Sequence, residues 1–353
     1  MTVVSLGVPS VQRPLGPAPT EGPLVDTFGR VATDLRVSLT DLCNLRCTYC
    51  MPAEGLDWLP ADQKLHPDEL IRLLTVAVTR LGITSVRFTG GEPLVVPHLE
   101  DLVAATAALR PRPEITLTTN GVGLARRAAA LKRAGLDRIN VSLDTVDRER
   151  FAAITRRDRL DDVLAGLRAA KDAGLHPVKV NAVLDPASGL DDVVGLLRYC
   201  LDHGYQLRII EQMPLDAGHS WQRDRVLSAD MILNALRRHF ALQPDPTPRG
   251  SAPAQLWQVF EGTTVLGRVG IIASVSQAFC AACDRSRLTA DGQVRNCLFA
   301  QDETDLKTLL RAGADDAALE AAWRQAMWSK AAGHGINDPN FVQPARPMSA
   351  IGG

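Results

Sequence analysis

One pattern repeats six times between residues 26 and 240: a short strand-like run, a turn, and an amphipathic helical run. The expected strands span residues 35–40, 85–89, 114–119, 138–144, 178–184 and 207–213, and the expected helices span residues 68–81, 99–110, 124–134, 160–173, 191–203 and 229–240. This alternation predicts a parallel sheet with helices outside it. Six units are fewer than the eight of a closed barrel. We therefore expect an α/β fold built on a partial, open (βα)6 TIM-like barrel.

Two proline-rich stretches divide the chain. The first, residues 14–23, holds four prolines and two glycines, a composition typical of a segment without a core, so we expect residues 1–25 to form a flexible leader. The second covers residues 244–253. After it we expect two hairpins, turned at residues 261–262 and 291–292, and a helical stretch over residues 304–330. The barrel should then span residues 26–245, and a smaller C-terminal domain residues 246–353.

Five of the expected strands carry polar residues on one face, whereas strands of an ordinary parallel sheet are apolar on both faces. Alternation places these residues on a common side: Arg36, Ser38 and Thr40; Arg87 and Thr89; Thr116, Thr118 and Asn120; Asn140, Ser142 and Asp144; Lys179 and Asn181. They would line a lumen that contains Arg36, Arg87 and Lys179. Unpaired buried cations are costly, so this lumen should bind an anion or hold water. Exposed edge strands with solvated faces are the alternative.

Composition excludes several classes of protein. With 39 basic and 40 acidic residues the formal net charge is −1, which gives no general affinity for nucleic acid. The start of the chain lacks a secretory signal, and no run of about 18 apolar residues predicts a membrane span. We therefore expect a cytoplasmic protein whose seven cysteines form no disulfide framework. Cys200, within an expected helix, should be a buried packing residue.

Three cysteines with C-x3-C-x2-C spacing, Cys43, Cys47 and Cys50, follow the first expected strand directly. They therefore lie at its C-terminal end, where strand–helix barrels place their active sites. Three thiolates can hold three irons of a 4Fe–4S cluster and leave the fourth iron open to a ligand. Structural zinc is the alternative, but it requires a fourth ligand, and the next histidine, His66, is sixteen residues after Cys50.

Cys280, Cys283 and Cys297 form a second group, again without an obvious fourth ligand. A zinc site completed by His334 is one interpretation, and a second iron–sulfur cluster is the other. Arg285 and Arg287 come directly after Cys283, and we expect them to project from the same loop.

The first cysteine group, with Tyr49 before its last cysteine, is followed on the next strand by Thr89-Gly-Gly-Glu-Pro93. In this combination the chain resembles the radical S-adenosylmethionine (SAM) superfamily. The resemblance implies that the open iron binds the amino and carboxylate groups of SAM, and that an electron from the cluster cleaves SAM to a 5'-deoxyadenosyl radical. Glycines suit such a site because their backbone can approach the ammonium group closely.

A second resemblance covers nearly the whole chain from about residue 26. The C-x2-C pair followed by Arg-x-Arg, the later third cysteine, the runs at residues 139–144, 179–181 and 333–337, and the terminal Gly-Gly resemble the GTP 3',8-cyclase family. That resemblance implies radical SAM-dependent conversion of GTP to (8S)-3',8-cyclo-7,8-dihydroguanosine 5'-triphosphate, the first step of molybdenum cofactor biosynthesis. It also implies two 4Fe–4S clusters, one in each cysteine group, with the second anchoring the guanine base.

The same resemblance assigns site residues. It implies SAM contacts at Tyr49, Gly91, Ser142 and Met213, and GTP contacts at Arg36, Arg87, Thr118, Lys179, Arg285, Ser286 and Arg287. It also implies that the tail ending in Gly352 and Gly353 enters the catalytic site. Met213 and Arg208 have opposite parity on the last expected strand, so either that strand bulges or one of the two lies outside the lumen. We consider Arg208 as a further phosphate contact.

The implied partners are GTP, an electron donor protein and, downstream, cyclic pyranopterin monophosphate synthase, with no nucleic acid or membrane. The chain should be a monomer or a homodimer. Two other functions stay open. One is a radical SAM enzyme with an auxiliary cluster that acts on a peptide, and the other is a non-catalytic iron–sulfur protein.

Overall fold

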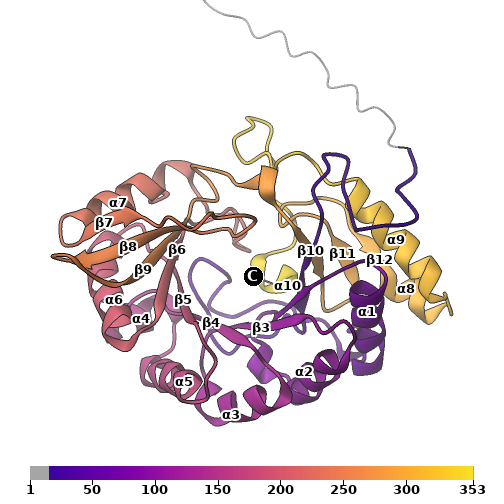
Figure 1. Cartoon of the computed structure of the whole chain (residues 1–353), viewed down its shortest axis with the longest axis horizontal. Helices are drawn as coiled ribbons and strands as arrows, with labels where there is room; N and C mark the ends of the chain where they lie inside the picture. Colours follow the sequence, from indigo (N-terminus) through magenta and orange to yellow (C-terminus); the bar gives the residue numbers. More distant parts are fainter. Residues whose placement is uncertain (1–15, 353) are drawn as a thin grey trace, which may run out of the picture.

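The computed structural model describes residues 16–352. Within them, twelve strands form one sheet in the order β12-β11-β10-β1-β2-β3-β4-β5-β6-β9-β8-β7. Its central strands are β1 (Asp34–Ser38), β2 (Ser85–Thr89), β3 (Glu114–Thr119), β4 (Arg138–Ser142), β5 (Val178–Val183) and β6 (Gln206–Ile210). Each of these six pairs in parallel with the next. The two outermost strands do not pair with each other, so the barrel is open and the predicted partial barrel is confirmed (Figure 1).

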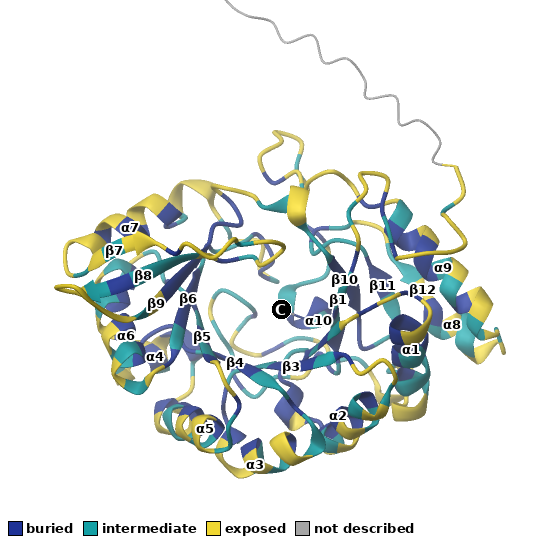
Figure 2. Ribbon diagram, viewed as in Figure 1, coloured by how far each residue is buried: buried dark blue, intermediate teal, exposed yellow. Residues whose placement is uncertain are grey.

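Helices cover the outside of this sheet. They are α1 (Pro67–Thr79), α2 (Leu99–Ala108), α3 (Leu124–Ala134), α4 (Arg148–Thr155), α5 (Leu160–Asp172), α6 (Gly189–His203) and α7 (Ala229–Arg237). Their apolar faces pack on the strands and their polar faces are exposed (Figure 2). In α6, Cys200 is fully buried in this core, as expected. No helix in the described part of the chain is both long enough and apolar enough to cross a membrane.

Strands from the C-terminal part of the chain extend the barrel at both sides. β9 (Thr264–Ile272) pairs in parallel with β6, and β10 (Arg285–Leu288) pairs in parallel with β1. The sheet is completed by β7 (Ala241–Pro244), β8 (Gln255–Glu261), β11 (Gln293–Arg295) and β12 (Thr304–Asp305). Without β9 and β10, strands β6 and β1 would be open edges with unpaired backbone groups. The division near residue 245 stays a prediction, and the hydrogen-bonded sheet runs across it.

Three local expectations were wrong. Arg285 and Arg287 lie on strand β10, not on a loop, because the parallel pairing with β1 begins there. The last barrel strand, β6, ends at Ile210, before the expected end at residue 213. The expected helix over residues 304–330 is split into α8 (Leu306–Arg311) and α9 (Asp316–Trp328), because Asp315 caps a new start by accepting a hydrogen bond from the Ala318 N–H at 2.9 Å.

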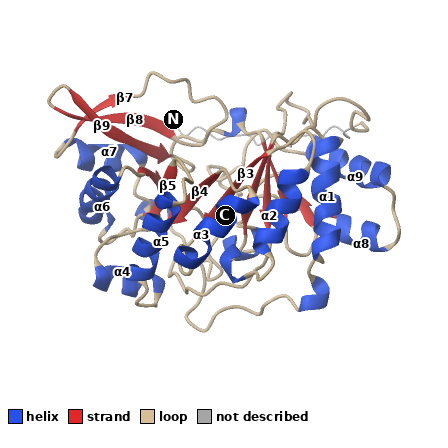
Figure 3. Cartoon of the chain, turned by 60° about the horizontal axis from the view of Figure 1, so that its bottom comes forward, coloured by secondary structure: helices blue, strands red, loops and turns tan. Residues whose placement is uncertain are grey.

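The two ends of the described chain are both held by contacts. Residues 16–25, part of the expected leader, lie along α9: Arg324 donates to the Gly22 carbonyl at 2.9 Å, and Leu24 is fully buried. Residues 1–15 of that leader lie outside the described residues. Helices α8 and α9 lie beside α1 (Figure 3). The chain then returns to the inside of the barrel and ends in α10 (Met348–Ile351).

Candidate active site inside the barrel

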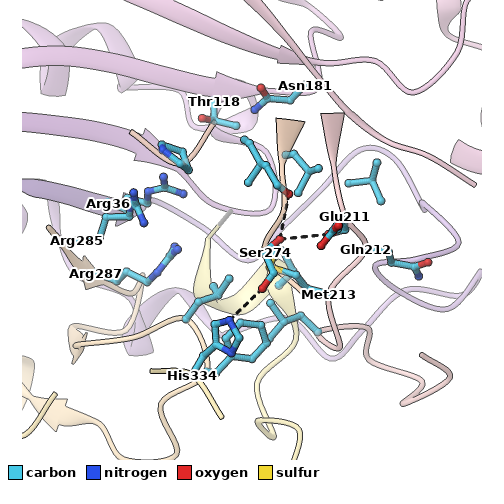
Figure 4. A pocket seen from close by; sticks show the side chains of 18 of the residues that line it. Arg36, Thr118, Asn181, Glu211, Gln212, Met213, Ser274, Arg285, Arg287 and His334 are labelled. Atoms are coloured by element: carbon cyan, nitrogen blue, oxygen red, sulfur yellow. Dashed lines mark hydrogen bonds between the residues drawn. The ribbon is translucent and has the colours of Figure 1, made fainter. Parts of the chain in front are cut away.

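A cavity of about 330 Å³ lies inside the barrel (Figure 4). Barrel strands contribute Asp34 and Arg36 (β1), Arg87 (β2), Thr118 (β3), Asn140 and Ser142 (β4), Asn181 and Val183 (β5), and Arg208 and Ile210 (β6). These residues alternate along each strand, because side chains two positions apart share a face. The predicted lumen with polar strand faces is therefore confirmed.

Five arginines from four strands face this cavity: Arg36, Arg87, Arg208, Arg285 and Arg287. Burial, together with Arg287, holds the pKa of Arg36 well below its usual range. Burial likewise lowers the pKa of Arg208 to about 9 and that of Arg287 to about 10, with Arg87 and Arg285 respectively adding repulsion. Nitrogens of Arg36 and Arg87 are buried without a hydrogen-bond partner among the described residues. Clustered guanidinium groups with unused donors are suited to a polyanion such as a triphosphate.

The other arginines of this group already have partners. Arg208 Nε donates to Asn181 Oδ1 at 2.9 Å. Arg285 donates to the Ser251 carbonyl at 2.7 Å and lies over the Phe279 ring, 5.1 Å from its centroid. These contacts orient the two guanidinium groups toward the cavity before any ligand is bound.

Two of the predicted GTP contacts do not line the cavity. Lys179 shares the inward face of β5 with Asn181 but lies nearer the start of the strand; burial, then Arg208 and Arg138, lowers its pKa to about 7. Ser286 lies between two inward-facing arginines on β10, so its side chain points to the opposite side. There its hydroxyl accepts a hydrogen bond from Trp323 Nε1 at 3.0 Å. Only the backbone of Ser286 remains available to a nucleotide.

The first cysteine group lies on the loop after β1. Cys50 is part of the cavity wall, and the Arg46 and Thr48 N–H groups anchor the loop to α4 by donating to the Thr155 and Ile154 carbonyls. Burial raises the pKa of the Cys43 and Cys47 thiols, and it raises that of Cys50 to about 12. Thiols buried in this way are stable as thiolates only with a cation or metal beside them.

The Gly-Gly-Glu run is built against this loop. A side chain at Gly91 would place its Cβ 2.3 Å from the Asp41 and Leu42 carbonyl oxygens, so this glycine is required by the contact between two loops. Gly91 does not line the cavity. The Glu92 carboxylate turns toward β3 and accepts hydrogen bonds from the Thr119 hydroxyl and the Asn120 N–H at 2.6 and 2.7 Å.

The other predicted SAM contacts are part of the cavity wall. Tyr49, Ser142 and Met213 all line it, and Tyr49 Oη donates to Asp144 Oδ2 at 2.8 Å. Burial raises the pKa of Asp144 to about 6. Arg208 and Met213 both line the cavity because β6 ends at Ile210, so strand parity does not apply to Met213.

The second cysteine group, Cys280, Cys283 and Cys297, lines the same cavity. Burial raises the pKa of Cys280. Burial would also raise that of Cys283, but Lys330 and Arg285 reverse the effect and lower it. Lys330 Nζ is 3.4 Å and Arg285 Nη1 is 3.5 Å from Cys283 Sγ.

Neither cysteine group is arranged for zinc. No three His, Cys, Asp or Glu side chains among residues 16–352 are placed to hold a single metal ion. Both ring nitrogens of His334 already have partners, one at the Ser274 carbonyl and the other at the Ile336 N–H. A 4Fe–4S cluster is bound by thiolates that each reach a different iron. Three thiols per group, close enough to interact electrostatically but not converging on one point, fit that donor set.

The C-terminal tail lies between the two cysteine groups. Met348 lines the cavity, and Ser349 lies against the Cys50 thiol. The Gly352 carbonyl accepts a hydrogen bond from Arg287 Nη1 at 2.7 Å, with the backbone of Gly352 at φ +88°. Gly353 lies outside the described residues.

Comparison with known proteins identifies the family. Residues 37–200 match the model of the radical SAM superfamily, and residues 205–336 match the model named Molybdenum Cofactor Synthesis C. A protein of Mycobacterium sp. strain KMS named GTP 3',8-cyclase is 77% identical over 353 residues, covering 100% of both chains. The chain belongs to the GTP 3',8-cyclase family. Its relatives include proteins named GTP 3',8-cyclase in Mycolicibacterium smegmatis (75% identical) and GTP 3',8-cyclase 2 in Mycobacterium tuberculosis (71%), again over 100% of both chains.

Solved structures support the radical SAM fold. Streptococcus suis SuiB bound to S-adenosylmethionine superposes with a TM-score of 0.55 at 16% identity, over 83% of this chain and 68% of that chain. A second structure of Streptococcus suis SuiB superposes with a TM-score of 0.51 at 17% identity, over 81% of this chain and 66% of that chain. At this identity the likeness concerns the fold alone.

In this GTP 3',8-cyclase family member, Glu211 is a site residue that no sequence motif indicated. Its buried carboxylate accepts hydrogen bonds from the N–H groups of Ala229, Val275 and Ser276, each at 2.8 Å. Glu211 thereby ties the end of β6 to the start of α7 and to the segment after β9, and Figure 4 shows it beside Ser274 of that segment. Its position directly after a barrel strand was the available signal. Lys330, at the end of α9, carries no such signal.

Proposed function

We propose that this chain is a GTP 3',8-cyclase with two 4Fe–4S clusters, which converts GTP to (8S)-3',8-cyclo-7,8-dihydroguanosine 5'-triphosphate in molybdenum cofactor biosynthesis. One observation carries the proposal: a single cavity is lined by Cys50 of the first cysteine group, by all three cysteines of the second and by five arginines. A site for SAM at one end and a triphosphate-binding wall at the other would bring a radical source within reach of a nucleotide.

Each cysteine group would hold one cluster, Cys43, Cys47 and Cys50 the first and Cys280, Cys283 and Cys297 the second. When bound, the first cluster and SAM supply the 5'-deoxyadenosyl radical that takes hydrogen from ribose C3'. The protein positions this pair: Tyr49, Ser142 and Met213 border the space beside Cys50. The Tyr49 hydroxyl is held by Asp144, so the aromatic ring keeps one orientation. Gly91 contributes by letting its loop pack on the cysteine loop.

The nucleotide would be held from several strands at once. Arg36, Arg87, Arg285 and Arg287 present guanidinium groups to the triphosphate, and Arg208 adds a fifth. Thr118 borders the same space, whereas Lys179 would act at longer range and Ser286 only through its backbone. Because these groups are buried, each phosphate contact is stronger than it would be in water. The arginines therefore orient ribose and base for reaction.

The tail completes the enclosure. Through Arg287 and the Gly352 carbonyl, the tail is tied to the wall that would bind the nucleotide, and Gly352 and Gly353 would take part in catalysis. An enclosed site protects a carbon radical from side reactions.

The remaining assignments follow from the proposed chemistry. The clusters require an electron donor protein, and the product would pass to a cyclic pyranopterin monophosphate synthase. We place the enzyme in the cytoplasm, as a monomer or a homodimer, without a nucleic-acid or membrane partner.

The deciding experiment measures 5'-deoxyadenosine formation by anaerobically reconstituted protein with SAM and a strong reductant, in the presence of GTP, of ATP or of no nucleotide. We expect formation to rise with GTP alone and the cyclised nucleotide to accumulate. Cleavage that is indifferent to nucleotide would leave the radical chemistry and point to another substrate, such as a peptide. No cleavage by protein that holds both clusters would point to a non-catalytic iron–sulfur protein.

A further inference from the structure

A buried lysine lies behind the second cysteine group, on the side away from the cavity. Lys330 follows the C-terminal end of α9 and is only 3% exposed. Its ammonium donates to the Arg285 carbonyl at 2.9 Å and lies 3.4 Å from Cys283 Sγ. Lys330 is not part of the cavity wall, so it cannot contact a nucleotide there.

The charge of Lys330 has no carboxylate partner. Among the ion pairs of the described residues, none includes Lys330, and its ammonium contacts the Cys283 and Arg285 carbonyl oxygens and the Cys283 sulfur. Nearby Arg30 provides a contrast, because it also donates to a carbonyl of this region, at Cys280, but pairs with the Asp26 carboxylate at 2.5 Å. A buried ammonium without a counter-charge is costly. The negative charge that would compensate Lys330 must therefore come from its remaining neighbour, the sulfur.

We propose that Lys330 is a positioning residue for the second cluster, whose ammonium compensates the thiolate charge at Cys283 and raises the cluster's reduction potential. The inference rests on the proposed function, because it requires a cluster at Cys280, Cys283 and Cys297. Hydrogen bonds to the sulfurs and nearby positive charge are established determinants of cluster potential. Reduction adds negative charge, so a fixed cation 3.4 Å from a ligand sulfur favours the reduced state.

This role separates Lys330 from the arginines. Arg285 also reaches Cys283 Sγ, at 3.5 Å, but its guanidinium faces the cavity, where a triphosphate would compete for it. The ammonium of Lys330 is shielded from the nucleotide, so its effect on the sulfur persists in every step of turnover. Substrate binding should therefore change the influence of Arg285 on the cluster and leave that of Lys330 unchanged.

The test compares full-length, reconstituted wild-type protein with Lys330→Met, which keeps the length of the side chain but removes its charge, and Lys330→Arg, which keeps the charge. Lys307→Met is the matched control, because Lys307 also donates to a carbonyl, that of Gln63 at 2.7 Å, and lies outside both cysteine groups. Iron content is measured first. Each protein is then titrated with dithionite and redox mediators, and the reduced clusters are followed by electron paramagnetic resonance. The signal that changes on addition of SAM belongs to the first cluster.

At a fixed applied potential we expect Lys330→Met to lower the ratio of reduced to oxidised second cluster about tenfold, which equals about 59 mV for a one-electron couple. Lys330→Arg and Lys307→Met should titrate like the wild type, and the first cluster should not shift in any variant. An unchanged second potential in fully loaded Lys330→Met would overturn the proposal.

Loss of iron from the second site also has a defined meaning. If Lys330→Met loses that iron while Lys330→Arg keeps it at wild-type potential, the charge is required for the cluster and the proposal is supported. If Lys330→Arg also loses that iron, the second cluster depends on the shape of the lysine side chain and not on its charge, which overturns the proposal. Wild-type protein that loads only about four irons per chain, rather than about eight, would contradict the proposed function itself, before any variant is compared.

Discussion

The two cysteine groups offer the same ligand chemistry but lie in opposite electrostatic surroundings. Around the first group, burial raises the thiol pKa values; Asp144 raises that of Cys47 further, and at Cys43 the carboxylate Glu92 acts in the same direction while Arg46 opposes it. The hydrogen bond to a sulfur there comes from a neutral amide, Asn120 Nδ2, 3.7 Å from Cys43 Sγ. Around the second group, the donors to Cys283 Sγ are the cations Lys330 and Arg285, and the Phe299 N–H donates to Cys297 Sγ at 3.5 Å.

This difference suits two different tasks. Negative and apolar surroundings disfavour extra electrons, so a cluster there is a strong reductant, as the cleavage of SAM requires. Cationic surroundings favour negative charge, so the other end of the cavity can hold both a cluster and an anionic nucleotide. In the proposed enzyme, charged neighbours of the two cysteine groups would thus separate an electron-donating region from a substrate-binding region.

The largest expected effects come from removing one cysteine from each group, because the two losses should affect different products. Cys43→Ala should abolish 5'-deoxyadenosine formation, because SAM would lose its cluster. Cys297→Ala should keep a measurable part of that formation but lose the cyclised nucleotide, because the second group would serve the substrate. Both products are quantified in one assay by chromatography.

Cys200→Ala is the matched control, since Cys200 is buried in α6 and belongs to neither group. It should retain iron and turnover. If Cys297→Ala lost SAM cleavage as completely as Cys43→Ala while its first cluster was intact, the two groups would not be divided in function.

Glu211 ties the end of β6 to the start of α7 and to the segment after β9, so its loss should destabilise this side of the barrel. In Glu211→Ala two buried N–H groups, those of Ala229 and Val275, and the partly buried N–H of Ser276 lose their acceptor, which should lower the free energy of unfolding by about 3 kcal/mol. Glu211→Gln keeps one carbonyl oxygen and should lose less. Denaturant unfolding measures both, against Glu261→Ala at an exposed position, which should stay within about 0.5 kcal/mol of wild type. Equal stability of Glu211→Ala and Glu261→Ala would show that the link carries little energy.

Local patterns predicted one part of this site and not the other. The inward faces of Arg36, Arg87 and Asn181 follow from the two-residue period of strands, and the cysteine spacing is visible in the sequence. Strand ends were less predictable: the early end of β6, which brings both Arg208 and Met213 to the cavity, depends on tertiary hydrogen bonds of the following segment.

Contacts between distant segments could not be predicted. The parallel pairing of β10 with β1 sets Arg287 beside Arg36, although 251 positions separate them. Lys330 and Cys283 meet only because α9 packs behind β10 through Trp323 and Ser286. No local period encodes such contacts, since they depend on how whole elements pack. The charge difference between the two cysteine groups therefore became visible only in three dimensions.

Substitution of Gly352 tests whether turnover requires the C-terminal tail to lie between the two cysteine groups. A Cβ at this position would be 2.9 Å from Thr89 Cγ2 and 3.0 Å from Ser38 Cβ, and the backbone lies at φ +88°. Gly352→Ala should displace the tail and lower turnover about tenfold, with both clusters retained. Gly195→Ala is the control, because its nearest neighbouring atom would be 4.0 Å away and alanine is favourable within a helix. Turnover is measured by product formation. Equal turnover in the two variants would show that the position of the tail does not affect the reaction.

The smallest expected effect is a change in GTP affinity with pH, and it depends on Lys179 at the edge of the substrate-binding region. Its pKa is lowered to about 7, by burial first and then by Arg208 and Arg138, so the free protein loses this charge as pH rises above 7. A bound triphosphate would raise the pKa again, and binding would take up a proton. GTP affinity should therefore fall a few-fold between pH 7 and pH 8, with the fall absent in Lys179→Met. Calorimetry in buffers of different ionisation enthalpy measures that proton directly. The same pH dependence in Lys179→Met would assign it to another group, and the substrate region would then owe its charge to the arginines alone.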